Sequence, residues 1–209
     1  MTQLILGLIL FLGAHSVRIV ADDWRTQKIE AWGEKAFKGV YTVASLLGFY
    51  LLVVGYGEAR LQTVALWTPP TATRHISVLL MLFASILLMA AYVPRNHLKM
   101  RLGHPMVLSV KVWALAHLLA NGNLADVVLF GAFLVWSVLN FKSARARDRA
   151  LLSSATASDD ASDSSPIENE SPKQPKTVAT LIAVLLGLAF WGGMTFVLHA
   201  QWIGVSPLG

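Results

Sequence analysis

Residues 103–141 read GHPMVLSVKVWALAHLLANGNLADVVLFGAFLVWSVLNF. Two apolar runs, Met106–Ala120 and Leu124–Phe141, flank the turn-forming tripeptide Asn121-Gly122-Asn123. A spanning helix needs about 20 mainly apolar residues, which the second run approaches and the first reaches only with its flanking residues. The short connection predicts an antiparallel helical hairpin in a membrane, with Asp126 capping the second helix.

The composition of the whole chain supports a bilayer as its solvent. Of 209 residues, 55% are hydrophobic and 14% are charged, whereas soluble domains have about 45–50% and about 25%. The mean hydropathy is +0.57. A cytoplasmic globular enzyme is therefore excluded. The sequence contains no cysteine, which excludes disulfides, iron–sulfur clusters, thiolate haem ligation and cysteine nucleophiles.

Working outward from the hairpin, we find six apolar stretches that predict an all-α, polytopic membrane bundle of about six transmembrane helices. The first stretch has no positively charged leader and no small-x-small cleavage site, so we interpret it as a retained span rather than a signal peptide. The stretches are Leu4–Val20, Phe37–Tyr56, Ile76–Val93, Met106–Ala120, Leu124–Phe141 and Val178–Ile203.

The basic residues are distributed unevenly over the loops between these spans. Fourteen of the 17 Lys and Arg residues fall on the first, third and fifth loops, and two fall on the other loops. The positive-inside rule therefore predicts cytoplasmic odd loops and two extracytoplasmic termini. The basic pI near 9.7 is explained by this topology, and no basic-aromatic pattern indicates nucleic acid.

Three segments follow from this reading: a five-span helical core over residues 1–142, a disordered polar cytoplasmic loop over 143–177, and the sixth span with its tail over 178–209. Within the loop, Ala157–Pro175 has almost no apolar residues and is expected to be disordered.

Two shorter features have structural interpretations. The first loop predicts a short helix that Asp22 or Asp23 caps, with Trp24 and Trp32 at the membrane interface. In the second span, four small residues indicate a close-packing face rather than a cofactor site. They are Gly39, Ala44, Ser45 and Gly48.

Ionisable residues inside spans are candidate functional residues because their burial in lipid is costly. Their depth predicts an inner histidine layer, His15 with His104, and an outer layer, His117 with His199. His117 follows His104 by 13 residues, about 20 Å along a helix, so the two cannot share one small ligand.

Two imidazoles from facing helices suit the axial positions of haem b in an apolar site. Lys111 lies on nearly the same face as His104, where its ammonium could pair with a propionate or a buried carboxylate. The alternative is that these side chains hydrogen-bond neighbouring helices. A haem-free metal site lacks the HxxxH or HExxH spacing. His117, His199 and Asn121 are secondary candidates.

The stretch Gly103–Ala125, quoted above, resembles the signature of the NnrU family of membrane proteins, as do five further segments of this chain. They are Gly13–Ile19, Trp32–Glu34, Gly48–Gly57, Ala91–Pro94 and the ending from Leu198-His199 to Leu208.

That resemblance implies a role in nitrite and nitric oxide respiration of denitrifying bacteria, with a reductase system as a partner and no settled molecular activity. The related zeta-carotene isomerase of plants and cyanobacteria is an integral membrane enzyme with a bis-histidine haem b, acting on a hydrophobic polyene. Its His-Ser and His-Pro motifs match His15-Ser16 and His104-Pro105, which implies that His15 and His104 are the axial ligands.

Two departures from the family pattern are visible. Gly103 stands where the family usually has Arg before His-Pro, and the polar Ala157–Pro175 run replaces a segment that usually carries Thr-Ser and Pro-Phe.

Three functions remain open at this point. The first is a haem b protein, either an isomerase or a redox-responsive component. The second is a non-enzymatic accessory or assembly protein for a nitric oxide or nitrite reductase. The third is a membrane methyltransferase using S-adenosylmethionine, although the Arg, Tyr and Gly that flank its His-Pro motif are absent here.

Overall fold

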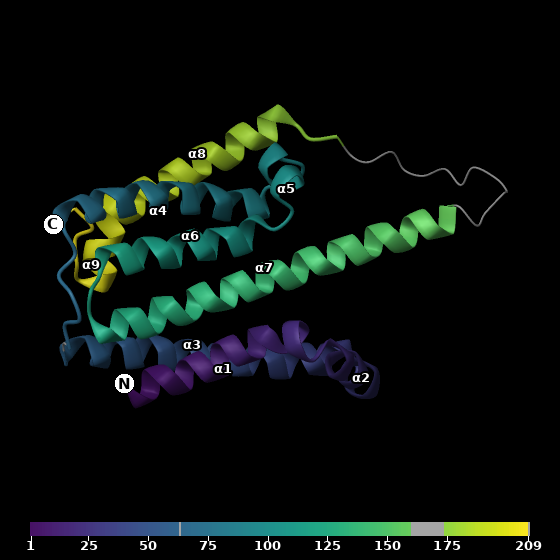
Figure 1. Cartoon of the computed structure of the whole chain (residues 1–209), viewed down its shortest axis with the longest axis horizontal. Helices are drawn as coiled ribbons and strands as arrows, with labels where there is room; N and C mark the ends of the chain where they lie inside the picture. Colours follow the sequence, from purple (N-terminus) through teal and green to yellow (C-terminus); the bar gives the residue numbers. More distant parts are fainter. Residues whose placement is uncertain (63, 160–173, 209) are drawn as a thin grey trace. The chain divides into compact units, whose positions relative to one another are not determined.

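The computed structural model describes residues 1–62, 64–159 and 174–208. All regular secondary-structure elements in these residues are helices, and the β-type pairing among them is an isolated bridge between Ala65 and Asn123. The all-α prediction is therefore confirmed. In chain order the elements are α1 (Thr2–Val20), α2 (Asp22–Trp32), α3 (Glu34–Leu61), α4 (Thr71–Tyr92), α5 (His97–Leu102), α6 (Pro105–Ala120), α7 (Leu124–Asp159), α8 (Thr177–Gly193), the π-helical turn η1 (Met194–Leu198) and α9 (His199–Ile203) (Figure 1).

Five of these helices are long and apolar enough to cross a membrane, which makes this a multi-pass membrane protein. They are α1, α3, α4, α7 and the continuous helical segment Thr177–Ile203. The predicted fourth span coincides with α6, whose 16 residues extend only about 24 Å, less than the hydrocarbon core of about 30 Å. Six spans and the orientation of the termini thus remain predictions.

The described residues form two compact units. Unit 1 comprises Met1–Ser77 and Trp113–Asn140, and unit 2 comprises Val78–Val112 and Phe141–Gly209.

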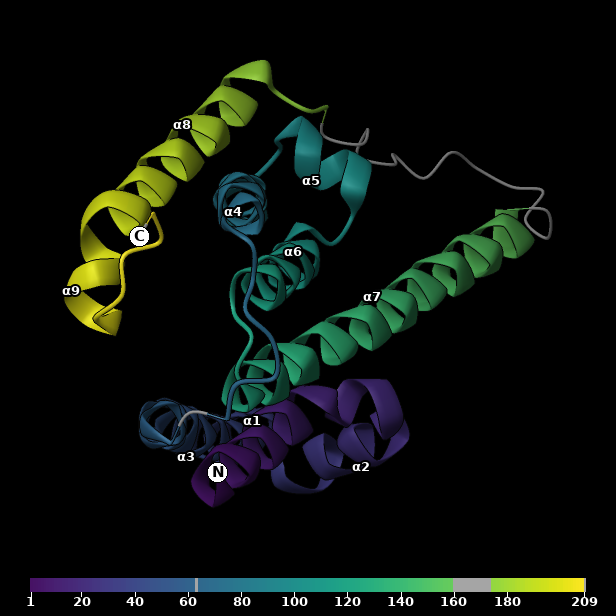
Figure 2. The ribbon, with the colours of Figure 1, turned by 60° about the vertical axis from the view of Figure 1, so that its left-hand side comes forward.

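Unit 1 is organised by a close contact between α1 and α3, which lie side by side in both views (Figures 1 and 2). A Cβ atom added at Gly7 would lie 2.6 Å from the Leu52 nitrogen, and one at Gly48 would lie 2.7 Å from the Phe11 nitrogen. Glycine therefore permits the two backbones to touch, as small residues do where membrane helices pack. The predicted packing role is confirmed for Gly48, whereas a Cβ at Gly39 would meet nothing within 4 Å.

The predicted hairpin turn is also present in unit 1. α6 ends at Ala120 and α7 begins at Leu124, and the carbonyl of Gly122 accepts the backbone N–H groups of Leu66 and Trp67 at 2.8 and 3.2 Å. The turn is thereby fastened to the α3–α4 connection.

In unit 2, polar contacts tie α4 to its neighbours. The Ser109 hydroxyl of α6 donates to the Ala84 carbonyl at 2.7 Å, and the Trp191 indole of α8 donates to the Val78 carbonyl at 3.0 Å. The α4–α5 turn is fixed by Asn96, which is fully buried, donates to the carbonyls of Ala90 and Val93, and caps α5 by accepting the Lys99 N–H.

Two sequence predictions are corrected here. Residues 143–159 are not a disordered loop, because α7 continues to Asp159. Ala, Arg and Leu in this segment favour helix, and the Arg147 guanidinium donates to Ser143 one turn away at 2.7 Å. The rest of the Ala157–Pro175 prediction falls mainly on residues 160–173, outside the described residues.

The second correction concerns α2. The N-cap residue of α2 is Ala21, whose side chain makes no capping hydrogen bond. The Ala21 N–H donates to the Val17 carbonyl at the end of α1, so the two helices follow each other without a loop. Asp22 and Asp23 lie in the first turn, where their negative charges interact favourably with the positive end of the helix dipole.

We predict opposite effects for two alanine substitutions in α3. A Cβ at Gly55 would lie 2.3 Å from the Leu4 nitrogen, whereas a Cβ at Gly57 would meet nothing within 4 Å. Gly55→Ala should lower the free energy of unfolding by about 1–3 kcal/mol through overpacking, and Gly57→Ala should be neutral or raise it by up to about 1 kcal/mol. Thermal unfolding in detergent checks both; equal destabilisation by the two variants would contradict the packing described.

The number of spans is also testable. If α6 crosses the membrane, the count is even and both termini lie on the same side. A phosphatase reporter that is active only outside the cytoplasm should then be active at both ends of the chain and inactive after Lys142. Activity at one end alone would show an odd number of crossings.

Candidate histidine sites

His15 lies on α1, among aromatic rings that come from three helices of unit 1. Its ring centroid is 4.3 Å from Phe11 of α1, 5.3 Å from Tyr41 of α3 and 6.2 Å from Trp136 of α7. Its Nδ1 lies 2.7 Å from the Phe11 carbonyl oxygen. The three ring contacts and the hydrogen bond together define the orientation of the His15 ring.

The hydrogen bond to Phe11 also assigns the protonation of the His15 ring. A carbonyl oxygen can only accept, so Nδ1 carries the proton, and in a neutral imidazole Nε2 then carries the lone pair. Histidines that bind metal through Nε2 commonly donate a hydrogen bond from Nδ1 to a carbonyl or carboxylate oxygen.

Trp136 adds an unusual polar group beside His15. Its indole Nε1 is buried, and among the described residues it has no hydrogen-bond partner. A buried donor without a partner costs about 1–3 kcal/mol, so an acceptor supplied by a bound group would stabilise this position.

His104 occupies a different kind of site, in unit 2. It follows Gly103, whose φ of +75° ends α5, and it precedes Pro105, the first residue of α6. The His104 carbonyl accepts the Leu108 N–H at 3.2 Å, so His104 is the N-cap residue. Proline is favoured at the first helical position because its missing N–H is not needed there.

The imidazole of His104 bonds to the extension of α7. Its Nε2 lies 2.8 Å from Oδ2 of Asp148, with the two side chains 28% and 40% exposed. Because a carboxylate can only accept, Nε2 carries the proton, and a neutral His104 has its lone pair on Nδ1. The protonated nitrogen is thus Nε2 in His104 and Nδ1 in His15. A partly exposed pair of this kind stabilises by about 0–1 kcal/mol at most.

A cation lies beside this histidine even though position 103 is glycine. The Arg145 guanidinium approaches to 3.6 Å from the point where a Cβ of residue 103 would stand, and Asp148 approaches to 3.9 Å. The positive charge at this position comes from α7.

The pairing of Lys111 with a propionate or a buried carboxylate stays a prediction, and the contact that the structure gives this side chain is aromatic. Its Nζ lies 4.6 Å from the ring centroid of Phe141, and the rings of Phe141 and His104 are arranged edge to face with their centroids 6.3 Å apart. The structure therefore brings His104 and Lys111 to one aromatic side chain, and the ammonium is stabilised by a cation–π interaction.

The secondary candidates make local contacts. His117 stacks on Phe130 at 4.5 Å, its Nδ1 lies 2.9 Å from the Trp113 carbonyl, and its own carbonyl accepts the Asn121 amide. His199, in unit 2, places Nδ1 2.6 Å from the Val205 carbonyl. No group of three or more His, Asp or Glu side chains that could hold a metal ion occurs within residues 1–62, 64–159 and 174–208.

One polar cluster in unit 1 includes a residue that sequence reasoning missed. Asp126 is buried and accepts the Asn123 N–H and side-chain amide at 3.3 and 3.1 Å, which confirms its capping role. It also accepts the Tyr56 hydroxyl at 2.5 Å, from a residue 70 positions away. A tyrosine near the end of an apolar span carries no signal of such a distant partner.

We predict that the two site histidines hold their protons on different nitrogens. The ¹⁵N shifts of the neutral rings should show His15 protonated at Nδ1 and His104 protonated at Nε2. Asp148→Ala should change the His104 signals and leave those of His15 unchanged. The variants His15→Gln and His104→Gln assign the signals; the same tautomer for both rings would contradict the hydrogen bonding described.

Comparison with known proteins places the chain in one family. A family model described as NnrU protein matches residues 3–207. No curated protein and no solved structure gave a match. Since the match extends over nearly all of the 209 residues, the chain belongs to the NnrU family.

Proposed function

We propose that this NnrU family protein binds haem b in the bacterial inner membrane and acts in nitrite or nitric oxide respiration. The observation that carries the proposal is the hydrogen bond from His15 Nδ1 to the Phe11 carbonyl, 2.7 Å long. It leaves Nε2 of a neutral imidazole available as an axial ligand, within an apolar span.

The surroundings of His15 support this assignment. Phe11, Tyr41 and Trp136 provide flat apolar surfaces next to the ring, and haem sites use such walls to exclude water. The unpartnered Trp136 N–H supplies a donor that an anionic group of a cofactor could satisfy. When bound, haem supplies a one-electron redox couple and, where an axial position is open, a binding site for small ligands.

His104, in unit 2, is the other candidate haem ligand, and it fits this role less directly. Its Nε2 is engaged by Asp148, so ligation through this atom requires the Asp148 hydrogen bond to be released. Arg145 and Lys111 then remain near as cations that can pair with carboxylates such as propionates. We therefore assign His15 of unit 1 as the haem ligand, and His104 of unit 2 stays the weaker candidate ligand.

An accessory role without a cofactor is the second candidate, and the contacts of unit 2 favour it. His104 with Asp148, and Lys111 with Phe141, already join the start of α6 to the extension of α7. In that case these side chains stabilise helix packing, and the protein supports assembly of a nitrite or nitric oxide reductase.

The absorption spectrum of the purified full-length protein decides between the two. We expect a Soret band that His15→Ala removes and His117→Ala retains. His117 is the matched control, because it lies in unit 1 and makes the same type of backbone hydrogen bond but is not the assigned ligand. His104→Ala should affect the band less than His15→Ala, because Nε2 of His104 is engaged by Asp148. Asp148→Ala should preserve or strengthen haem binding.

Three results would overturn the haem proposal. The first is folded, monodisperse wild-type protein that lacks a Soret band after expression with haem precursor. The second is a band that survives His15→Ala. The third is loss of the band in every histidine variant alike. A deletion strain in which reductase abundance falls while the purified protein is free of haem would support the accessory role instead.

A further inference from the structure

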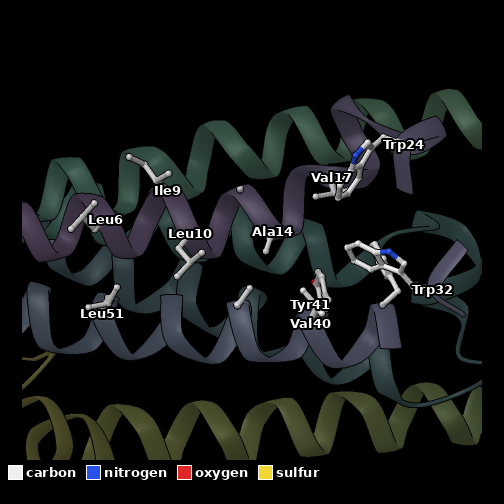
Figure 3. Close-up of a pocket in the computed structure, with 13 residues that line it drawn as sticks. Leu6, Ile9, Leu10, Ala14, Val17, Trp24, Trp32, Val40, Tyr41 and Leu51 are labelled. Carbon is white, nitrogen blue, oxygen red and sulfur yellow. The ribbon is translucent and has the colours of Figure 1, made fainter. Parts of the chain in front are cut away.

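Unit 1 contains an apolar groove between α1, α2 and α3, with a volume of about 640 Å³ (Figure 3). Leu6 and Leu51 lie at one end, and Trp24 and Trp32 of α2 lie at the other (Figure 3). The groove is open along one side, and its walls are made of apolar side chains apart from Tyr41 and the indoles.

The length of the groove matches one leaflet of a bilayer. Its wall on α1 runs from Leu6 to Val17, and the eleven helical steps between them extend about 16 Å. The hydrocarbon core of a bilayer is about 30 Å thick, so half of it is about 15 Å. An acyl chain that enters at the interface would therefore fill the groove from end to end.

A cation and two indoles mark the interfacial end. Lys28 Nζ lies 5.9 Å from the Trp24 ring centroid and 5.4 Å from that of Trp32. Tryptophan prefers the level of lipid headgroups. Neighbouring cations pair with acids, Arg25 with Asp22 at 3.5 Å and Lys38 with Glu34 at 2.6 Å, whereas the Lys28 ammonium is held over aromatic faces, with three donors that suit a phosphate.

The floor of the groove has room for a chain because of a glycine. A Cβ built on Gly13 would meet no atom within 4 Å, although Gly13 lines the groove. This glycine therefore makes no close helix contact, in contrast to Gly7 and Gly48, which lie where α1 and α3 touch.

We propose that the groove is a binding site for one phospholipid of the surrounding bilayer. One acyl chain lies along α1 and α3, and the headgroup phosphate contacts Lys28 between the two indoles. The bound lipid joins α2 to the α1–α3 pair. This site is separate from the proposed haem function, although Tyr41 lines the groove and also contacts His15.

Photo-crosslinking of the full-length protein tests the chain position. The protein is placed in vesicles of phosphatidylethanolamine and phosphatidylglycerol that contain a phosphatidylglycerol with a diazirine in its acyl chain. We expect saturable labelling of one lipid per protein, mapped by mass spectrometry to peptides of residues 6–51. Gly13→Leu should reduce the affinity about tenfold, because the new side chain displaces methylene groups of the lipid.

Gly39→Leu is the matched control. A Cβ at Gly39 also meets nothing within 4 Å, and Gly39 lies on α3 outside the groove lining. Circular dichroism and gel filtration verify that both variants are folded. Non-saturable labelling, labelling spread over all spans, or an equal loss in both variants would overturn the proposal.

Lys28→Gln tests the phosphate contact. Competition with unlabelled phosphatidylglycerol should displace the probe from the wild type better than diacylglycerol with the same acyl chains, and Lys28→Gln should remove this preference while labelling persists. Equal competition by the two lipids in the wild type would overturn the assignment of Lys28 to the phosphate.

Discussion

The approach of two backbones at three glycines determines the arrangement of unit 1. Gly7, Gly48 and Gly55 bring α1 and α3 into direct contact, because a Cβ at any of them would come within 3 Å of backbone atoms of the other helix. Within lipid, the hydrophobic effect gives little preference for one helix pairing over another, so close van der Waals packing decides which helices associate. The position of His15 relative to Tyr41, and the walls of the groove, both follow from this contact.

Much of this architecture could be predicted from apolar run length and turn composition. The runs and the Asn-Gly-Asn turn indicated a helical membrane protein with the α6–α7 hairpin, because lipid requires each backbone polar group to be satisfied within its own helix. The helical extension of α7 was missed because low hydropathy and high polarity describe both disorder and an exposed helix rich in Ala and Arg. The periodicity of such a polar segment does not distinguish disorder from an exposed helix.

The sequence identifies the candidate histidines, but it does not indicate which side chains surround them. Their cost in lipid made His15 and His104 stand out in the sequence. Trp136 and Asp148, which contact the two imidazoles, lie far from them in the chain. The protonation of His15 follows from the nearby Phe11 carbonyl, whereas that of His104 depends on the distant Asp148, so local spacing does not reveal that the two rings carry their protons on different nitrogens. Lys111 lies beside the ring of Phe141, a contact that no spacing in the sequence indicates.

The π-helical turn η1 has a consequence for the end of the chain. Ala183 and Gly187 are buried on α8, and the next buried residue is Thr195, eight positions after Gly187. A π-helical turn inside an α-helix accommodates one additional residue, and η1 does so between α8 and α9. Removing a single residue from Met194–Leu198 would let the segment anneal into a regular helix and would keep Thr195 in phase with its neighbours. A deletion, rather than a substitution, is thus the smallest genetic change that would remove η1 and leave His199 on the same face of its helix.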